Sequence, residues 1–127
     1  DRQDEELQGR LGREYLDYML RMVDFYEGQS IGLFDREIPQ TLLLHANALN
    51  ADHLGELVDS LRSRGYRFVD LDTALEDAAY ASEDTYTGPG GITWLHRWAI
   101  TRDVDRALFQ GEPTTAKWVQ ETAGIQE

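Results

Sequence analysis

The residues of this sequence best placed to do chemistry are a histidine and a leucine two positions before it. His45 ends the short apolar run 41–45, and Leu43 lies within that run. We expect the run to form a strand, in which residues two apart point to the same side, so that Leu43 and His45 share a face. In parallel α/β folds functional groups collect at the carboxyl ends of strands, and an imidazole there can act as a general acid or base. The alternative is a core histidine hydrogen-bonded to a loop.

Two other pairs of residues are weaker candidates. Asp52 and His53 could join His45 in a metal site, but they open a predicted helix, where an acidic residue normally favours the helix dipole. Trp94 and Trp98 could stack on sugar rings, although tryptophans four residues apart more often pack in a core. We therefore assign no metal ligand in this chain.

The elements that must position these residues follow from the apolar spacing. Helical spacing predicts a long first helix, and continuous apolar runs at 41–45 and 66–69 predict two buried strands. Because strands and helices alternate, we expect one helix-rich α/β domain with about two parallel strands. Its predicted parts are a first helix at 5–27 ended by Gly28, strand–helix units at 40–80, a tryptophan-containing helix at 91–102 and a tail at 103–127. Within 40–80, Asn50 and Asp72 are the predicted caps of two helices. On the helix at 91–102, His96 is expected to be exposed.

The composition excludes several classes of function. The chain has 127 residues, 41% of them hydrophobic, which allows one domain with a core. Its 24 acidic and 12 basic residues give a formal charge of −12, which argues against binding nucleic acid or anionic membrane surfaces. The absence of cysteine excludes disulfides and thiolate chemistry. No signal-peptide core or initial Met is present, so we expect a processed or truncated piece of unknown localisation.

Four stretches of the chain carry a family resemblance, and its sharpest part is Leu42-Leu43-Leu44-His45-Ala46-Asn47. These stretches are similar to C-terminal segments of bacterial polysaccharide deacetylases, the chitin, xylan and peptidoglycan deacetylase superfamily called carbohydrate esterase family four. The resemblance extends over roughly residues 15–120. Its stretches are Tyr15–Met19, Ile38–Leu54, Gly65–Val69 and Gly91–Trp98.

The resemblance implies a fold, a mechanism and two residue roles. The family fold is a distorted (β/α) barrel, and this chain would be its C-terminal part. The family, often secreted or periplasmic, removes acetyl groups from N- or O-acetylated carbohydrates with a divalent metal, usually zinc, held by one Asp and two His. Its last active-site motif is Leu-x-His. Carried over, Leu43 would line the pocket for the acetyl methyl group, and His45 would be the general acid that protonates the leaving group.

The other family motifs are absent from this chain. It has no adjacent pair of aspartates and no two histidines one helical turn apart, and it lacks the family's Arg-x-Pro-Tyr and Asp-Trp motifs. We therefore expect a C-terminal segment that begins after those motifs, holds no cofactor itself and is inactive alone. It would form a homo-oligomer or associate with a missing N-terminal half. The alternatives are a non-catalytic glycan-binding or self-associating half-barrel, and an interaction domain that uses the tyrosine-rich first helix.

Overall fold

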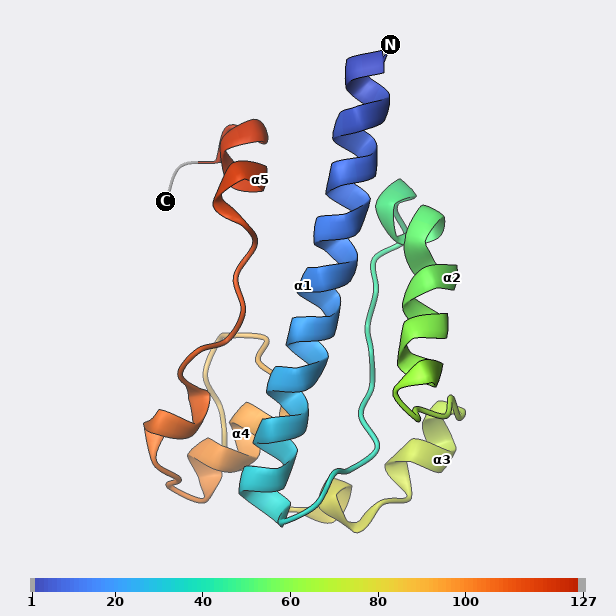
Figure 1. Ribbon diagram of the computed structural model, residues 1–127. Coiled ribbons are helices and arrows are strands. Elements are labelled where there is room, and N and C mark those ends of the chain that lie inside the picture. The colour runs from blue at the N-terminus through green and yellow to red at the C-terminus, as the bar shows by residue number, and fades with distance from the viewer. Residues whose placement is uncertain (1, 126–127) are drawn as a thin grey trace. The chain divides into compact units, whose positions relative to one another are not determined.

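The computed structural model describes residues 2–125, and every regular element in that range is a helix (Figure 1). Three α-helices, α1, α2 and α4, have eight residues or more, and the other elements are single turns or short 3₁₀ helices. In chain order the elements are α1 (Arg2–Phe34), α2 (Ala48–Ser63), α3 (Leu71–Leu75), the 3₁₀ helix η1 (Ala78–Ala81), α4 (Trp94–Thr101), the 3₁₀ helix η2 (Arg106–Phe109) and α5 (Lys117–Thr122).

The predicted α/β barrel fold is wrong for residues 2–125, because they contain no strand and no sheet. Residues 41–45 and 66–69, predicted as parallel strands, are neither helical nor part of a ladder. A strand exists only when its backbone amide and carbonyl groups pair with a neighbouring strand, and two strands alone are marginal in water. The apolar composition of the two runs predicted a buried sheet, but no described segment pairs with them.

The first helix is longer at both ends than the predicted 5–27, since α1 extends from Arg2 to Phe34. Gly28 was expected to cap this helix but lies inside it, followed by the buried Gln29 and Ser30. The helix ends where Asp35 takes a left-handed conformation, with φ at 55°. That conformation is a common way to end a helix, and here an aspartate takes the position that glycine usually occupies.

Side-chain caps set the starts of the shorter helices. Asn47, rather than the expected Asn50, caps α2 by accepting a hydrogen bond from the Asn50 backbone N–H at 2.9 Å. Asp70, rather than the expected Asp72, caps α3 through the Thr73 backbone N–H at 2.7 Å. Each correction moves the cap two or three residues toward the N-terminus. A helix predicted at 91–102 exists but is shorter, since α4 spans Trp94–Thr101 and Thr93 caps it. The predicted tail holds η2 and α5.

The chain divides into two compact units, which are described separately. Of the described residues, unit 1 contains 2–23, 43–67 and 113–125, and unit 2 contains 24–42 and 68–112. That these residues fold as one domain stays a prediction. In unit 1, Leu57 and Leu61 of α2 are the buried large apolar side chains. The core of unit 2 is larger and consists of Ile38, Ala79, Leu95 and Trp98, with Tyr26, Leu33, Phe34 and Tyr80 packed against it.

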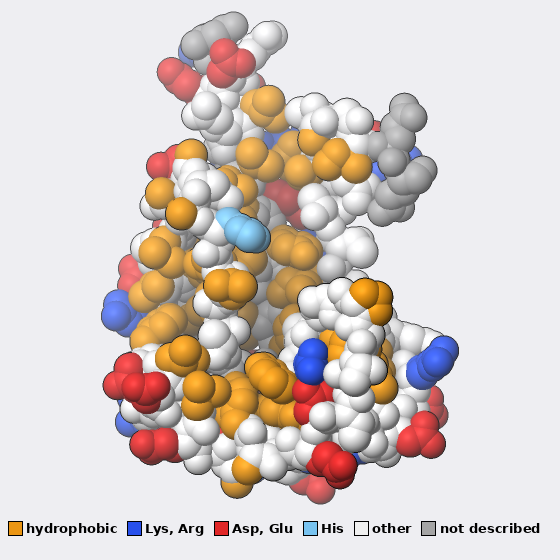
Figure 2. Space-filling view, turned by 180° about the vertical axis from the view of Figure 1, so that it is seen from behind, with side chains coloured by type: hydrophobic (Ala, Val, Ile, Leu, Met, Phe, Trp, Pro, Cys, Tyr) orange, Lys and Arg blue, Asp and Glu red, His pale blue; other side chains and the backbone are white. Residues whose placement is uncertain are grey.

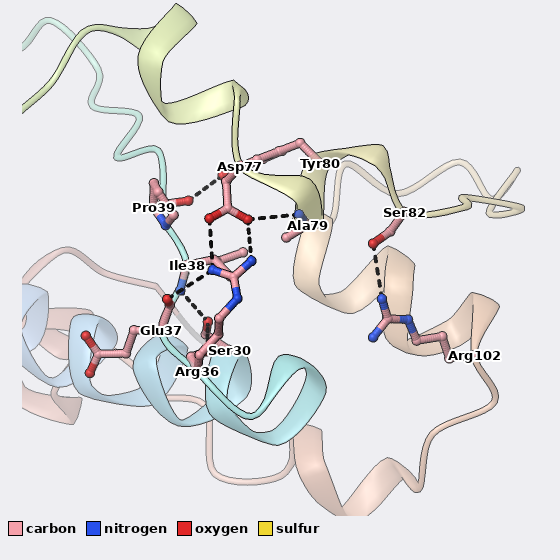
Figure 3. A network of polar contacts seen from close by, with 10 residues as sticks. All are labelled: Ser30, Arg36, Glu37, Ile38, Pro39, Asp77, Ala79, Tyr80, Ser82 and Arg102. Carbon is pink, nitrogen blue, oxygen red and sulfur yellow. Dashed lines mark hydrogen bonds and ion pairs between the residues drawn. The ribbon is translucent and has the colours of Figure 1, made fainter.

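In unit 2 a buried serine fixes the chain as it leaves α1. The Ser30 hydroxyl is fully buried, donates a hydrogen bond to the Arg36 carbonyl and accepts one from the Ile38 N–H, both at 2.9 Å (Figure 3). A buried hydroxyl normally requires such partners. These two bonds turn residues 35–38 back against the end of α1 and bring Ile38 into the core.

An ion pair then ties this turn to η1. The Arg36 guanidinium donates to both oxygens of the Asp77 carboxylate at 2.8 and 2.6 Å, and Asp77 also caps η1 through the Ala79 N–H (Figure 3). The hydrogen bond from Arg36 holds the pKa of the Asp77 carboxyl below its usual value, helped by the bond from Ala79. The Tyr80 hydroxyl of η1 also donates to the Pro39 carbonyl at 2.7 Å. This is a second bond between η1 and the segment that follows α1.

In unit 1 we expect Gly12→Ala to destabilise the packing of α1 on α2. A methyl group at this position would overlap the His53 ring of α2, whose Nδ1 lies 3.2 Å from Glu56 Oε1. Overpacking of this kind costs about 1–3 kcal/mol, whereas the gain in helix propensity from Gly to Ala is at most about 1 kcal/mol. The measurement is the free energy of unfolding in urea, followed by circular dichroism.

Gly9→Ala is the matched control for this prediction. A methyl group at Gly9 would meet only the Arg13 guanidinium, at an ordinary contact distance of 3.6 Å. We therefore expect Gly9→Ala to leave stability unchanged or raise it slightly. Equal stability of the two variants would show that His53 does not pack on Gly12.

Candidate functional site

The candidate acid and its neighbouring leucine lie in a non-helical segment directly before α2. Leu43 and His45 are exposed, and Leu44 between them is partly buried. The prediction that His45 ends a strand is wrong, because 41–46 carries no strand pairing. Leu43, with 85% of its surface exposed, is the most exposed of the large hydrophobic side chains in residues 2–125. The functional roles of both residues stay predictions.

Two side chains from the flanking helices hold the backbone at His45. The Asn50 side-chain amide in the first turn of α2 donates to the His45 carbonyl at 2.7 Å. The Tyr15 hydroxyl of α1 donates to the carbonyl oxygen of the same Asn50 side chain at 2.6 Å. All three residues belong to unit 1. The backbone of the candidate acid is therefore tied to α2 directly and to α1 through one intermediate side chain.

Sequence reasoning missed this pair of hydrogen bonds. Asn50 was interpreted as a cap of a helix, and Tyr15 as part of the apolar stripe of the first helix and of one stretch of the family resemblance. The available signal is the spacing Asn47-x-x-Asn50, because a cap at the first asparagine leaves the side chain of the second free for another partner. Nothing in the spacing connects Tyr15 with Asn50, which lie 35 positions apart.

Exposed apolar side chains are numerous around the molecule. Figure 2 shows many hydrophobic side chains on the face that it presents. Large apolar side chains left in water are expected to be covered by a ligand or a partner when they form a contiguous surface. The large hydrophobic residues exposed in unit 1 are Leu7, Leu43, Leu54 and Ile125, and those in unit 2 are Ile31, Leu42, Phe68, Val69, Leu71, Leu75, Trp94 and Ile100.

The acidic and histidine side chains of α2 form no metal site with residues 2–125. His53 lies against Gly12, its ring centroid is 6.0 Å from that of Tyr15, and Glu56 is its ion-pair partner. Asp52, beside it, is exposed. No group of three His, Asp or Glu side chains that could hold an ion occurs among the described residues.

The two tryptophans of α4 have different environments. Trp98 is 1% exposed and is part of the unit 2 core, as the packing interpretation predicts. Trp94 is 49% exposed, and its ring stacks on Trp98 with centroids 5.8 Å apart and planes at 26°. One face of Trp94 is thus covered by its neighbour, and the interpretation as core holds for Trp98 only.

The prediction that His96 is exposed is wrong. Its ring is partly buried in unit 2, with centroids 6.0 Å from Tyr26 and 4.8 Å from Phe109. Burial lowers the pKa of His96, and the nearby Glu112 carboxylate offsets part of that effect. Its Nε2 is buried with no hydrogen-bond partner among residues 2–125. His96 is therefore favoured in its neutral form by its packing.

A comparison of the chain with protein-family models, with curated proteins and with solved structures found no match. Among residues 2–125, no helix has the length and apolar character needed to cross a membrane.

Proposed function

We propose that this chain is the C-terminal segment of a metal-dependent polysaccharide deacetylase that removes acetyl groups from N- or O-acetylated glycans. His45 is the proposed general acid, and Leu43 the proposed contact of the acetyl methyl group. The observation that carries the proposal is the pairing of an exposed imidazole with the most exposed large apolar side chain of residues 2–125, two positions away. Leu43 gains most from contact with an apolar group, since so much of its surface faces water.

The proposed role of His45 is to complete bond cleavage. When water has added to the acetyl carbon, the bond from that carbon to the sugar nitrogen or oxygen breaks. The electron pair stays on the sugar atom, which takes the proton of the His45 imidazolium, and acetate is released. General acid catalysis of this kind contributes about 10²–10⁴-fold to a rate. His45 is exposed, so its side chain is accessible to a glycan.

The proposal places the metal ligands and the catalytic base outside this chain, because its sequence lacks the family's Asp-Asp pair and its two histidines one helical turn apart. A lone imidazole cannot hold zinc in a tetrahedral site. The chain alone is therefore expected to be inactive. It would contribute His45 as the general acid and Leu43 as the contact of the acetyl methyl group. The proposed partner is the rest of the polypeptide.

A second candidate function is a non-catalytic module that binds glycan or associates with itself. The observation that favours it is the exposure of apolar side chains in unit 2, including Leu42, Leu71 and Leu75. Burial of such surface stabilises a dimer by about 25 cal/mol per Å² before the costs of association. The charge of −12 on each copy opposes this, although salt screens it over roughly 10 Å.

The reading frame that encodes these residues separates the two proposals. For a deacetylase segment, we expect the in-frame sequence before Asp1 to encode an Asp-Asp pair and two histidines about one helical turn apart. The complete product should bind zinc stoichiometrically, measured by elemental analysis after purification. A start codon directly before Asp1, together with a stable dimer in light scattering, would instead support the self-associating module and contradict the deacetylase.

A further inference from the structure

We propose that Asn50 and Tyr15 are positioning residues for His45. They act by holding its backbone carbonyl in place, which fixes the Cα position from which the imidazole extends. This inference rests on the proposed function, because it concerns the same candidate acid. The geometry is the pair of hydrogen bonds from Tyr15 to Asn50 and from Asn50 to His45, at 2.6 and 2.7 Å. Neither residue touches the imidazole through these bonds, so both would act through the backbone.

The direction of both hydrogen bonds follows from the chemistry of the groups. A backbone carbonyl can only accept, so the side-chain atom of Asn50 that faces His45 must be the NH₂ group. The carbonyl oxygen of the Asn50 side chain then faces Tyr15 and can only accept, so the phenol must donate. The His45 carbonyl therefore sets the orientation of the Asn50 amide, and the hydrogen bond from Tyr15 stabilises the amide in that orientation.

The environment of Tyr15 suits this donor role. Its side chain is partly buried on α1, and burial raises the pKa of the phenol above its usual value. The hydroxyl thus keeps its proton throughout the range in which proteins are normally assayed. The hydroxyl bonds to Asn50, and the Tyr15 ring centroid lies 6.0 Å from that of His53.

A support of this kind is needed because the segment around His45 has little structure of its own. Residues 41–46 belong to no helix and no ladder. Asn50, by contrast, lies in α2, and its backbone N–H is bound to the Asn47 cap at 2.9 Å. The hydrogen bond from the Asn50 amide therefore restrains the non-helical residue His45 against the first turn of the capped helix α2. Displacement of a catalytic group by about 1 Å can lower a rate by 10²-fold.

The first test examines the hydrogen bond in this chain alone. The coupling across the bond between the Asn50 side-chain nitrogen and the His45 carbonyl carbon is measurable by nuclear magnetic resonance. We expect it in the wild type and its loss in Asn50→Asp, where a carboxylate oxygen faces the carbonyl. An aspartate in the first turn favours the dipole of α2, so the helix should persist. We expect Tyr15→Phe to weaken the coupling, because the amide is then free to rotate.

The second test measures catalysis in the complete metal-loaded polypeptide. We expect Tyr15→Phe and Asn50→Asp to lower kcat by about 10-fold to 10²-fold while KM stays within about 2-fold, because the acid is misplaced and glycan binding is not. Tyr18→Phe is the matched control, since it removes a hydroxyl from the same helix and leaves the ring that faces Arg21. It should keep both the coupling and kcat.

The outcomes separate this inference from the proposed function. Absence of the coupling in the wild type, or unchanged kcat in both variants while His45→Gln is impaired, overturns the positioning role and leaves the proposed acid in place. Full activity of His45→Gln overturns the proposed function and the positioning role together, even where the coupling is present. A loss of kcat in both Tyr15→Phe and Asn50→Asp, together with an unchanged kcat in Tyr18→Phe, supports the inference.

Discussion

Trp98→Ala is expected to lower the free energy of unfolding of unit 2 by about 3–5 kcal/mol, the usual cost of removing a buried tryptophan. Trp98 is 1% exposed and contacts three aromatic rings. The centroids of Phe34 and Tyr80 lie 5.5 Å away in edge-on arrangements, and that of Trp94 lies 5.8 Å away. Because domains are stable by only about 5–15 kcal/mol, this loss should be visible as a lower midpoint in urea.

Two further variants sharpen this prediction. Trp94→Ala removes a ring that is half exposed, so it should cost clearly less. Trp98→Phe should also cost less than alanine, because it keeps most of the ring volume and removes an indole N–H that is buried without a partner among the described residues. If Trp98→Ala and Trp94→Ala are equally stable, Trp98 is not the centre of the unit 2 core.

His45→Gln is expected to lower kcat of the complete metal-loaded deacetylase by about 10²–10⁴-fold, with KM little changed. Glutamine is close to histidine in size and can hydrogen-bond, but it cannot donate a proton to a leaving amine or alkoxide. His45 is exposed, and the bond from Asn50 is made to its backbone carbonyl, which the substitution retains. The folded structure should therefore persist. Acetate release at saturating glycan measures the effect.

His53→Gln is the matched control for this loss. It removes the other imidazole of unit 1, which packs on α1 and pairs with Glu56. We expect its kcat to stay within a few-fold of the wild type, even if stability falls. Equal losses in His45→Gln and His53→Gln would indicate a general structural effect and would contradict a specific role for His45.

The sequence predicts that the long helices exist more reliably than it predicts the residues at which they end. The apolar spacing at 5–27 and 91–102 identified α1 and α4, because helical periodicity persists over several turns. The end of α1 was missed because Gly28 is a common capping residue, whereas Ser30 of the same helix finds buried partners only in the folded chain. Local propensity cannot show which of several possible caps tertiary contacts will favour.

The strands were mispredicted for a different physical reason. The run 41–45 has the apolar composition of a buried strand, but composition reports only that a segment favours burial, not what pairs with it. In residues 2–125 no partner strand exists, and Leu42 and Leu43 are left exposed. The candidate acid could be singled out from sequence, whereas its support by Asn50 and Tyr15 depends on contacts between segments distant in the chain.

Proton donation by His45 is tested most directly by changing the leaving group, in the complete metal-loaded polypeptide and in its His45→Gln variant. A sugar amine must gain a proton as it departs, whereas a phenolate departs without one, so only the first leaving group needs a general acid. We therefore expect His45→Gln to lower kcat by about 10²–10⁴-fold for an N-acetylated glycan and far less for an aryl acetate. Equal losses of kcat for the two substrates would contradict the assignment of His45 as the acid.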